Sequence, residues 1–282
     1  MSPFASVVFA GGGSRCVWQI GFWEVVAPAI GLQPERIAAV SAGSAMASIL
    51  VSGQREEALH QFSSRMETNE KNFYPANLLK PGVPAFPQAA IYRDAMLGTF
   101  HEEAFRRLKE GPPIYILLAR PPRWVGARSG VLLGMLSYKL EKKFKQPLHP
   151  LWGQRVGFHP EVISSHDCET PEEFVDLVLQ SSCTPPFTPL FRRDGRVVLD
   201  GGMVDNVPVL ALPEGSLEQK TLVLLSRPYP KSKMLGLPNC TYVQPSRPAA
   251  VSTWDYTSPQ GLMDTYSVGR EDGENFLKSW EG

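Results

Sequence analysis

The sequence predicts an α/β fold with a central, mainly parallel sheet and helices on both faces. Short apolar runs of strand length alternate with longer segments whose apolar residues recur at helical spacing, and this alternation is typical of parallel sheets. The first two apolar runs, Val7 to Ala10 and Ile37 to Val40, are each followed by small residues and then by a helical segment. We therefore expect the functional groups at the carboxyl ends of the strands.

The first half of the chain contains most of the expected helices. Apolar spacing predicts helices at 17–26, 56–66 and 95–108, another helix starting at Met46, and strands at 7–10, 37–40 and 114–119. The segment from Tyr74 to Pro87 is rich in proline and lacks periodicity, so we expect an irregular loop or cover there.

The second half continues the alternation. Thr170 has the side chain of a helix N-cap, Pro171 suits the first helical position and two acids follow, which predicts a helix ending near Ser181. We expect strands within 156–164, at 197–199 and at 221–226, a last helix at 261–277, and irregular segments at 185–189 and 245–259.

Charge and length exclude several classes of protein. The 282 residues carry 28 basic and 28 acidic side chains, and this balance argues against a nucleic-acid-binding protein. No apolar run approaches the ~18 residues of a membrane span, and Pro3 to Ala10 is too short for the core of a signal peptide. We expect a single domain over 1–282.

The cysteines indicate the compartment. Cys16, Cys168, Cys183 and Cys240 are scattered without CxxC pairs. This spacing favours reduced thiols in a cytoplasmic protein over a disulfide framework or a zinc site.

A serine stands at the end of the second predicted strand. Ser41 follows four apolar residues and is flanked by small ones: Ala39, Ala42, Gly43 and Ala45. A strand, sharp turn and helix with serine at the turn is the nucleophile elbow of α/β hydrolases, although Ala39 replaces its usual first glycine. The alternative is a plain helix start capped by a serine.

A glycine run follows the first predicted strand. Gly11, Gly12 and Gly13 precede Ser14 and Arg15, and glycines let backbone N–H groups approach an oxyanion closely. The alternative is a phosphate loop. A Walker loop would end in Gly-Lys-Ser/Thr, and the dinucleotide pattern would need glycine at Cys16, so the oxyanion interpretation is preferred.

The candidate base is an aspartate. His60, His101, His149, His159 and His166 all precede Asp200, so a Ser-acid-His order using Asp200 is impossible. Asp200 ends a predicted strand and is followed by Gly201 and Gly202, where its carboxylate can take the proton of Ser41 directly. A tight Asp-Gly-Gly turn is the alternative.

The glycine run, the serine elbow and the late Asp-Gly-Gly together resemble the patatin-like phospholipase family, in order and context, from Val7 to about Pro208. The resemblance implies a three-layer patatin-like fold. It also implies a catalytic dyad of Ser41 and Asp200, and an oxyanion hole at Gly11, Gly12, Gly13 and Arg15. Ala39, Gly43, Gly201 and Gly202 support the two turns.

The function implied is hydrolysis of phospholipid or other acyl esters, without metal or organic cofactor. Two alternatives remain open. One is an esterase or thioesterase acting on soluble acyl substrates, and the other is a silent scaffold that binds lipid or a protein.

The stretch 120–150 matches no family motif and is expected to be a membrane-facing or cover insertion that borders the acyl pocket. Within 130–146, Leu132, Leu136 and Leu140 recur at helical spacing, and Lys139, Lys142, Lys143 and Lys145 follow. This pattern fits a helix lying on an anionic membrane surface, with some lysines snorkelling. It fits a core helix with basic residues at its carboxyl end equally well.

The dyad hypothesis makes a prediction about the histidines. Replacing the five one at a time by alanine should leave hydrolysis of a soluble ester within about twofold of the wild type, because none is assigned to proton transfer. Steady-state kinetics on a short-chain ester measures this. A single replacement as damaging as Ser41→Ala would reveal a histidine-based triad.

Overall fold

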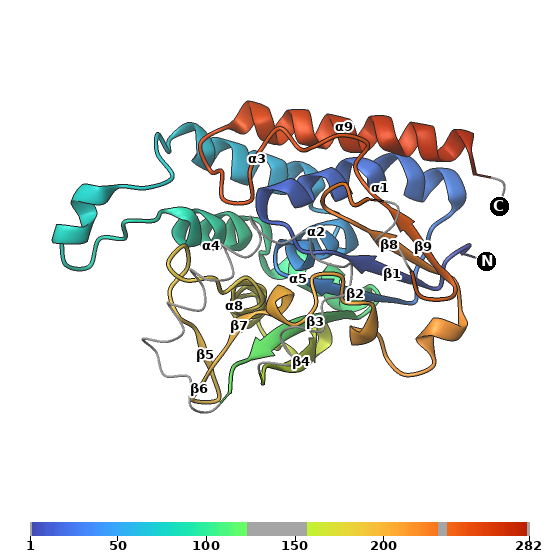
Figure 1. The fold of residues 1–282 in the computed structure, drawn as a ribbon, viewed down its shortest axis with the longest axis horizontal. Helices are drawn as coiled ribbons and strands as arrows, with labels where there is room; N and C mark the ends of the chain where they lie inside the picture. The colour runs from blue at the N-terminus through green and yellow to red at the C-terminus, as the bar shows by residue number, and fades with distance from the viewer. Residues whose placement is uncertain (1, 123–156, 231–235, 281–282) are drawn as a thin grey trace.

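The computed structural model describes residues 2–122, 157–230 and 236–280, and within them a seven-stranded sheet forms the centre of the molecule (Figure 1). The order β4-β3-β2-β1-β8-β9 is parallel from β3 to β9, while β4 and the short β7 pair antiparallel with β3. The strands are β1 (Ser6–Phe9), β2 (Arg36–Val40), β3 (Ile114–Arg120), β4 (His159–Ser164), β7 (Leu199–Asp200), β8 (Thr221–Leu224) and β9 (Cys240–Val243).

The α-helices of the described residues pack into one core on one face of the sheet, against inward residues such as Val7 and Phe9. These helices are α1 (Val17–Ile30), α2 (Ala42–Val51), α3 (Arg55–Glu67), α4 (Gln88–Thr99), α5 (Glu102–Glu110), α8 (Pro171–Ser181) and α9 (Pro259–Lys278). None of these helices is both long and apolar enough to cross a membrane.

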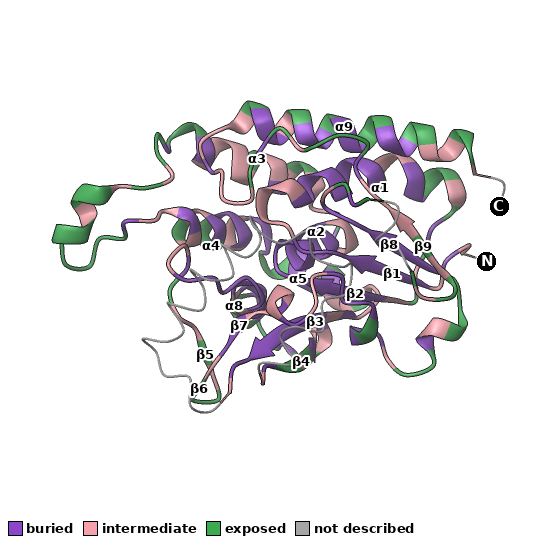
Figure 2. Cartoon of the chain, in the orientation of Figure 1, coloured by how far each residue is buried: buried purple, intermediate pink, exposed green. Residues whose placement is uncertain are grey.

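The opposite face of the sheet is buried by a second core. Val8 and Ala10, which alternate with the residues of the first face, pack against 3-10 helix η5 (Val209–Ala211) and the loops around it. Burial on both faces explains why the parallel strands β1, β2, β3 and β8 are largely apolar, and Figure 2 shows them buried along most of their length, whereas the edge strand β9 is only partly buried. The predicted α/β class and mainly parallel sheet are confirmed, and single-turn helices and loops form the described part of the second covering layer.

Two expected boundaries are wrong. The helix expected at 95–108 is two helices, because α4 begins at Gln88 and ends at Thr99, and His101 then caps α5 by accepting a hydrogen bond from the Ala104 N–H (3.4 Å). The strand expected at 197–199 is divided, with β6 (Arg196–Val197) pairing with β5 (Arg192–Arg193) and β7 pairing with β3. Strand β9 was not predicted.

Helix α8 begins and ends where the sequence predicts. The Thr170 hydroxyl accepts the Glu173 N–H at 3.2 Å, Pro171 opens the helix and Ser181 closes it. The segment 74–87 is irregular apart from η2 (Pro75–Leu79). The stretch 120–150, with its expected helix at 130–146, lies outside the described residues beyond position 122.

The first and last helices lie against each other over most of their length (Figure 1). Gly21 of α1 and Gly269 of α9 make this approach possible. A Cβ on Gly21 would lie 2.1 Å from the Tyr266 carbonyl oxygen, and one on Gly269 would lie 2.1 Å from that of Trp18. The Trp18 indole N–H also donates to Asp272 Oδ2 at 2.7 Å. Backbone contact across two small residues therefore holds α9 on α1.

The substitution Gly269→Ala should lower the free energy of unfolding by about 1–3 kcal/mol, because the added methyl forces the two backbones apart. Denaturant unfolding measures the change. Ser267→Ala, on the exposed side of the same helix, is the control and should unfold within about 0.5 kcal/mol of the wild type. Equal stability of Gly269→Ala and Ser267→Ala would contradict the tight contact.

Candidate active site

Ser41 occupies a strained turn between β2 and α2. Its backbone has φ 53° and ψ −138°, a conformation that residues with a side chain rarely adopt. The Ser41 N–H donates to the Ser181 hydroxyl at 2.8 Å, and the Ser41 carbonyl accepts the Ser44 N–H at 2.9 Å. Such strain persists only where surrounding contacts fix it, and it marks functional positions. The turn has the geometry expected of a nucleophile elbow.

Small residues let the elbow fit over the sheet. A Cβ on Gly43 would lie 2.6 Å from the Ala10 carbonyl oxygen and 2.7 Å from that of Phe9, so a larger residue would push α2 off strand β1. Ala39, which replaces the usual first glycine of the elbow, is fully buried in the helical core. Its methyl group is thus packed at this turn.

The glycine loop lies beside Ser41. A Cβ on Gly11 would stand 3.2 Å from the Ser41 Cβ. The Gly11 N–H donates to the Asn206 carbonyl oxygen (3.1 Å), while the Gly11 carbonyl accepts from Asn206 Nδ2 (3.0 Å) and the Ser226 hydroxyl (2.5 Å). Gly11 therefore serves as the spacer that lets the loop approach Ser41, and its own N–H is engaged.

Gly12 and Gly13 stand at the amino end of the 3-10 helix η1 (Gly13–Cys16), where the first N–H groups have no partner within the helix. Within the described residues, neither N–H donates to a protein acceptor. Gly13 has φ +60°, and a Cβ there would lie 2.1 Å from the Thr253 carbonyl oxygen. Arg15 braces the loop by donating from Nε to the Gly12 carbonyl oxygen at 3.1 Å.

Asp200 reaches the same place through β3. One edge of β3 pairs with β4, and the other pairs with β2 as far as Leu117 opposite Val40, and then with β7, where Asp200 is opposite Leu118. Asp200 therefore follows directly on the end of β2, where Ser41 begins the elbow. Strand spacing of about 3.3 Å per residue makes these two backbone positions neighbours.

The Asp200 carboxylate is held by its own turn. Oδ1 accepts the Gly202 N–H at 2.7 Å, and Oδ2 accepts from the Thr184 hydroxyl at 3.4 Å. A Cβ on Gly201 would lie 2.1 Å from the Leu117 carbonyl oxygen, and one on Gly202 would lie 3.0 Å from Asp200 Oδ1. The Asp-Gly-Gly sequence thus forms a tight turn, and the hydrogen bond to the Gly202 N–H within this turn fixes the orientation of the Asp200 carboxylate.

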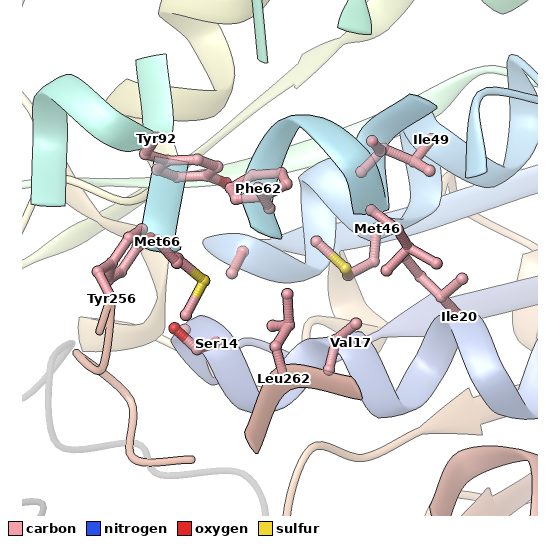
Figure 3. A pocket seen from close by; sticks show the side chains of 14 residues that line it. Ser14, Val17, Ile20, Met46, Ile49, Phe62, Met66, Tyr92, Tyr256 and Leu262 are labelled. Carbon is pink, nitrogen blue, oxygen red and sulfur yellow. The ribbon is translucent and has the colours of Figure 1, made fainter. Parts of the chain in front are cut away.

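An apolar pocket adjoins the glycine loop and the elbow, and Figure 3 shows side chains that line it. Gly13 and Ala42 line it, and it continues between α1, α2, α3 and α9, enclosing about 470 Å³ of space that includes some open to solvent. Val17, Met46 and Leu262 meet around it in Figure 3. Its lining is predominantly apolar, as in small-molecule sites. The 74–87 segment, which the sequence predicts as an irregular loop or cover, supplies none of its lining.

Two tyrosines, Tyr92 and Tyr256, lie near Met66 at one end of the pocket, where the Ser14 hydroxyl also lies (Figure 3). Burial raises the pKa of Tyr92 well above its usual value, with a further contribution from nearby Tyr256, and burial also raises the pKa of Tyr256. Both phenols are therefore neutral at physiological pH, so the pocket is uncharged.

The histidines of the described residues lie on elements other than those that carry Ser41, the glycine loop and Asp200. His60 is exposed on α3, His101 caps α5, His159 opens β4, and His166 belongs to 3-10 helix η3 (Ser165–Asp167). None of the four lines the pocket, and His149 lies outside the described residues.

Sequence reasoning missed Ser181 and Asn206. The Ser181 hydroxyl accepts the Ser41 N–H and donates to the Leu117 carbonyl oxygen at 2.7 Å, and Asn206 joins the Gly11 loop to the turn after Asp200. Serine at a helix end and asparagine in a loop are common, so no local sequence pattern indicated that Ser181 or Asn206 belongs to the candidate site. Their roles depend on contacts between distant segments.

Comparison with known proteins places the chain in a family. The family model of patatin-like phospholipases matches residues 7–213. Among solved structures, VipD from Legionella pneumophila is similar at 12% identity and TM-score 0.48, covering 98% of this chain and 67% of VipD. The type III effector protein ExoU is similar at 12% identity and TM-score 0.36, covering 98% of this chain and 53% of ExoU. No curated protein matches the chain.

The family model spans β1, the glycine loop, the Ser41 elbow and the Asp200 turn, which are the segments that the fold brings together. The chain belongs to the patatin-like phospholipase family.

Proposed function

We propose that the protein hydrolyses lipid acyl esters with a Ser41–Asp200 dyad. One observation carries the proposal: the strained Ser41 elbow stands beside the glycine loop, and an apolar pocket begins at Gly13 and Ala42, one on each side of it. A nucleophile next to an apolar pocket, as Ser41 is through its neighbour Ala42, suits an ester whose acyl chain enters the pocket.

Ser41 acts as the nucleophile. Its Oγ attacks the ester carbonyl carbon while Asp200 takes the hydroxyl proton, and the tetrahedral intermediate collapses as the protonated Asp200 returns that proton to the departing alcohol. The Ser41 acyl ester remains. Asp200 then deprotonates a water molecule that attacks this ester, and the fatty acid leaves with Ser41 restored. The mechanism calls for no metal or organic cofactor.

The oxyanion hole is assigned to the N–H groups of Gly12 and Gly13. They lie at the start of η1 and donate to no protein acceptor within the described residues, so they are available when negative charge develops on the carbonyl oxygen. Gly11 supports them by its small size, and Arg15 supports them by fixing the Gly12 carbonyl.

Ser181 is assigned a positioning role. Its hydroxyl bridges the Ser41 N–H to the Leu117 carbonyl of β3, and β3 also carries Asp200 through its pairing with β7. The bridge thus fixes the nucleophile relative to the strand that places the base. Its neighbour Ser182 is also buried, but its hydroxyl makes no hydrogen bond with the elbow or with β3 among the described residues, and it lies close to Tyr92.

Ser41→Ala and Asp200→Asn should each lower kcat on a soluble short-chain ester by about a thousandfold or more, and the double variant should lose little more, because the two residues act as one unit. A fluorophosphonate should label the wild type and fail to label Ser41→Ala. Unchanged thermal unfolding shows that the fold survives. Near-full activity of Asp200→Asn would refute the dyad, and absence of labelling in an intact wild type would favour a silent scaffold.

Ser181→Ala should lower the free energy of unfolding by about 1–3 kcal/mol, because it leaves two buried backbone groups without partners. It should also lower kcat more than it changes KM, since the displaced group is the nucleophile. Ser182→Ala, at the neighbouring buried serine, is the control and should destabilise the protein less than Ser181→Ala, because its hydroxyl does not bridge the elbow to β3. The bridge would have no positioning role if the two variants behaved alike.

A further inference from the structure

The loop between α3 and α4, residues 68–87, extends away from the body of the protein (Figure 1). Its tip is exposed in Figure 2, although much of it is apolar. Of the six exposed large hydrophobic side chains among the described residues, four belong to this loop: Phe73 (42%), Leu78 (67%), Leu79 (88%) and Val83 (44%). Such clustering marks an interaction site, whereas single exposed apolar residues are ordinary.

The loop has its own structure. The Tyr74 N–H donates to the Ala85 carbonyl oxygen at 2.8 Å, and Asn77 Nδ2 donates to that of Pro84 at 3.1 Å, so the two arms are joined across the tip. The single turn η2 presents Leu78 and Leu79 at the far end. The apolar side chains are thus held outward instead of folding back onto the protein.

The base of the loop is anchored next to the pocket. Asn69 Nδ2 donates to the Tyr256 carbonyl oxygen and Asn72 Oδ1 accepts the Tyr256 N–H, both at 2.8 Å. Tyr256 lines the pocket, as do Met66 just before the loop and Tyr92 just after it. The loop therefore departs from the end of the pocket that these three residues surround.

An aromatic series joins the loop to the turn beside the candidate base. Phe73 stacks on Phe86 (4.8 Å between centroids), Phe86 meets Phe187 edge-on (5.2 Å), and Phe187 stacks on Trp254 (4.5 Å). Phe187 lies in the segment whose Thr184 contacts the Asp200 carboxylate. The loop is therefore packed against the segment that bounds the candidate site.

The charge of the loop identifies its partner. Over residues 68–87 it carries two exposed lysines, Lys71 and Lys80, and one exposed carboxylate, Glu70, at its base, so the part from Lys71 to Pro87 that includes the tip is purely basic. Apolar side chains between lysines are the composition of segments that lie in a membrane interface, where the apolar groups enter the acyl boundary and the lysines meet anionic head groups.

We propose that the α3–α4 loop inserts its Leu78–Leu79 tip into an anionic lipid bilayer. This insertion would hold the end of the pocket that Met66, Tyr92 and Tyr256 line close to the lipid surface. The proposal rests on the proposed function for its consequence in catalysis. It names a surface distinct from the 130–146 segment considered from the sequence.

The binding test uses Ser41→Ala protein, so that no lipid is consumed and the result does not depend on catalysis. Sedimentation with vesicles of phosphatidylcholine containing phosphatidylglycerol should show binding, and Leu78→Glu with Leu79→Glu should weaken it about tenfold or more, because two apolar groups no longer enter the bilayer. Leu210→Glu is the matched control, since Leu210 is as exposed as Leu78 (67%) and lies on η5 across the sheet. It should bind as the parent does.

Charge contributes separately. Lys71→Gln and Lys80→Gln should each weaken binding to these vesicles about fivefold, as expected for a lysine near an anionic surface, with little effect on the weaker binding to phosphatidylcholine alone. If both lysine variants bound the anionic vesicles as tightly as the parent protein, the assignment to an anionic surface would be overturned.

A probe shows whether the tip enters the lipid. Leu79→Cys labelled with a polarity-sensitive fluorophore should shift to shorter wavelength on adding anionic vesicles, and Leu210→Cys should not. Labelling is selective because burial raises the pKa of Cys16 to about 12 and the pKa values of Cys168 and Cys183 to about 11, while the pKa of Cys240 is also raised. These thiols therefore react slowly. An unshifted spectrum at Leu79→Cys would overturn insertion.

With the active enzyme, the Leu78→Glu, Leu79→Glu variant should hydrolyse vesicle lipid more slowly and a soluble ester at the wild-type rate. Vesicle binding equal to that of the Leu210→Glu control would overturn the proposal. So would concentration-dependent self-association in the absence of lipid that the glutamates abolish, since it would assign the tip to a second copy of the chain. Failure of the proposed function would appear instead as an inactive wild type that still binds vesicles.

Discussion

The pairing of β3 is the constraint on which the candidate site depends. Its one edge must serve β2 up to Leu117 and β7 from Leu118 onward, so that two strands distant in sequence meet end to end. This places Ser41 and Asp200 together although 159 positions separate them. Hydrogen bonding to a single rigid strand, buried on both faces, fixes the two backbones better than two loops would. The same strand receives the Ser181 bridge, which links helix α8 to the elbow.

The strain of the elbow is offset by its neighbours. A residue with a side chain at positive φ costs about 1–3 kcal/mol, and Ser41 adopts it because both of its backbone groups are engaged. Close contact of Gly43 with β1 and of Gly201 with β3 leaves the surrounding backbone little room to relax. The strained backbone of Ser41 is therefore held in place by the tightly packed backbone around Gly43 and Gly201.

The sequence predicted the fold class and the separate motifs because each rests on local chemistry. Strand length, glycine runs, the elbow at Ser41 and the cap at Thr170 are all read within a few residues. The Ser181 bridge, the Asn206 link and the pocket form only when segments distant in sequence meet, so no local sequence pattern predicts them. The break at His101 was missed because apolar spacing continues across it, and β9 was missed because Cys240–Val243 is short and only partly buried. The catalytic roles themselves, and the helix expected at 130–146, remain predictions.

The pocket has a consequence for synthesis of the protein. Its walls combine Gly13 and Val17, from the first strand–helix unit, with Tyr256 and Leu262, which lie beyond the 7–213 region matched by the family model. Thr253 also packs on the glycine loop. On a ribosome, the serine, the aspartate and the glycines are all made well before this last wall exists. A nascent chain therefore contains Ser41, Asp200 and the glycine loop before the pocket has all of its walls, and the pocket is complete only once α9 has been made.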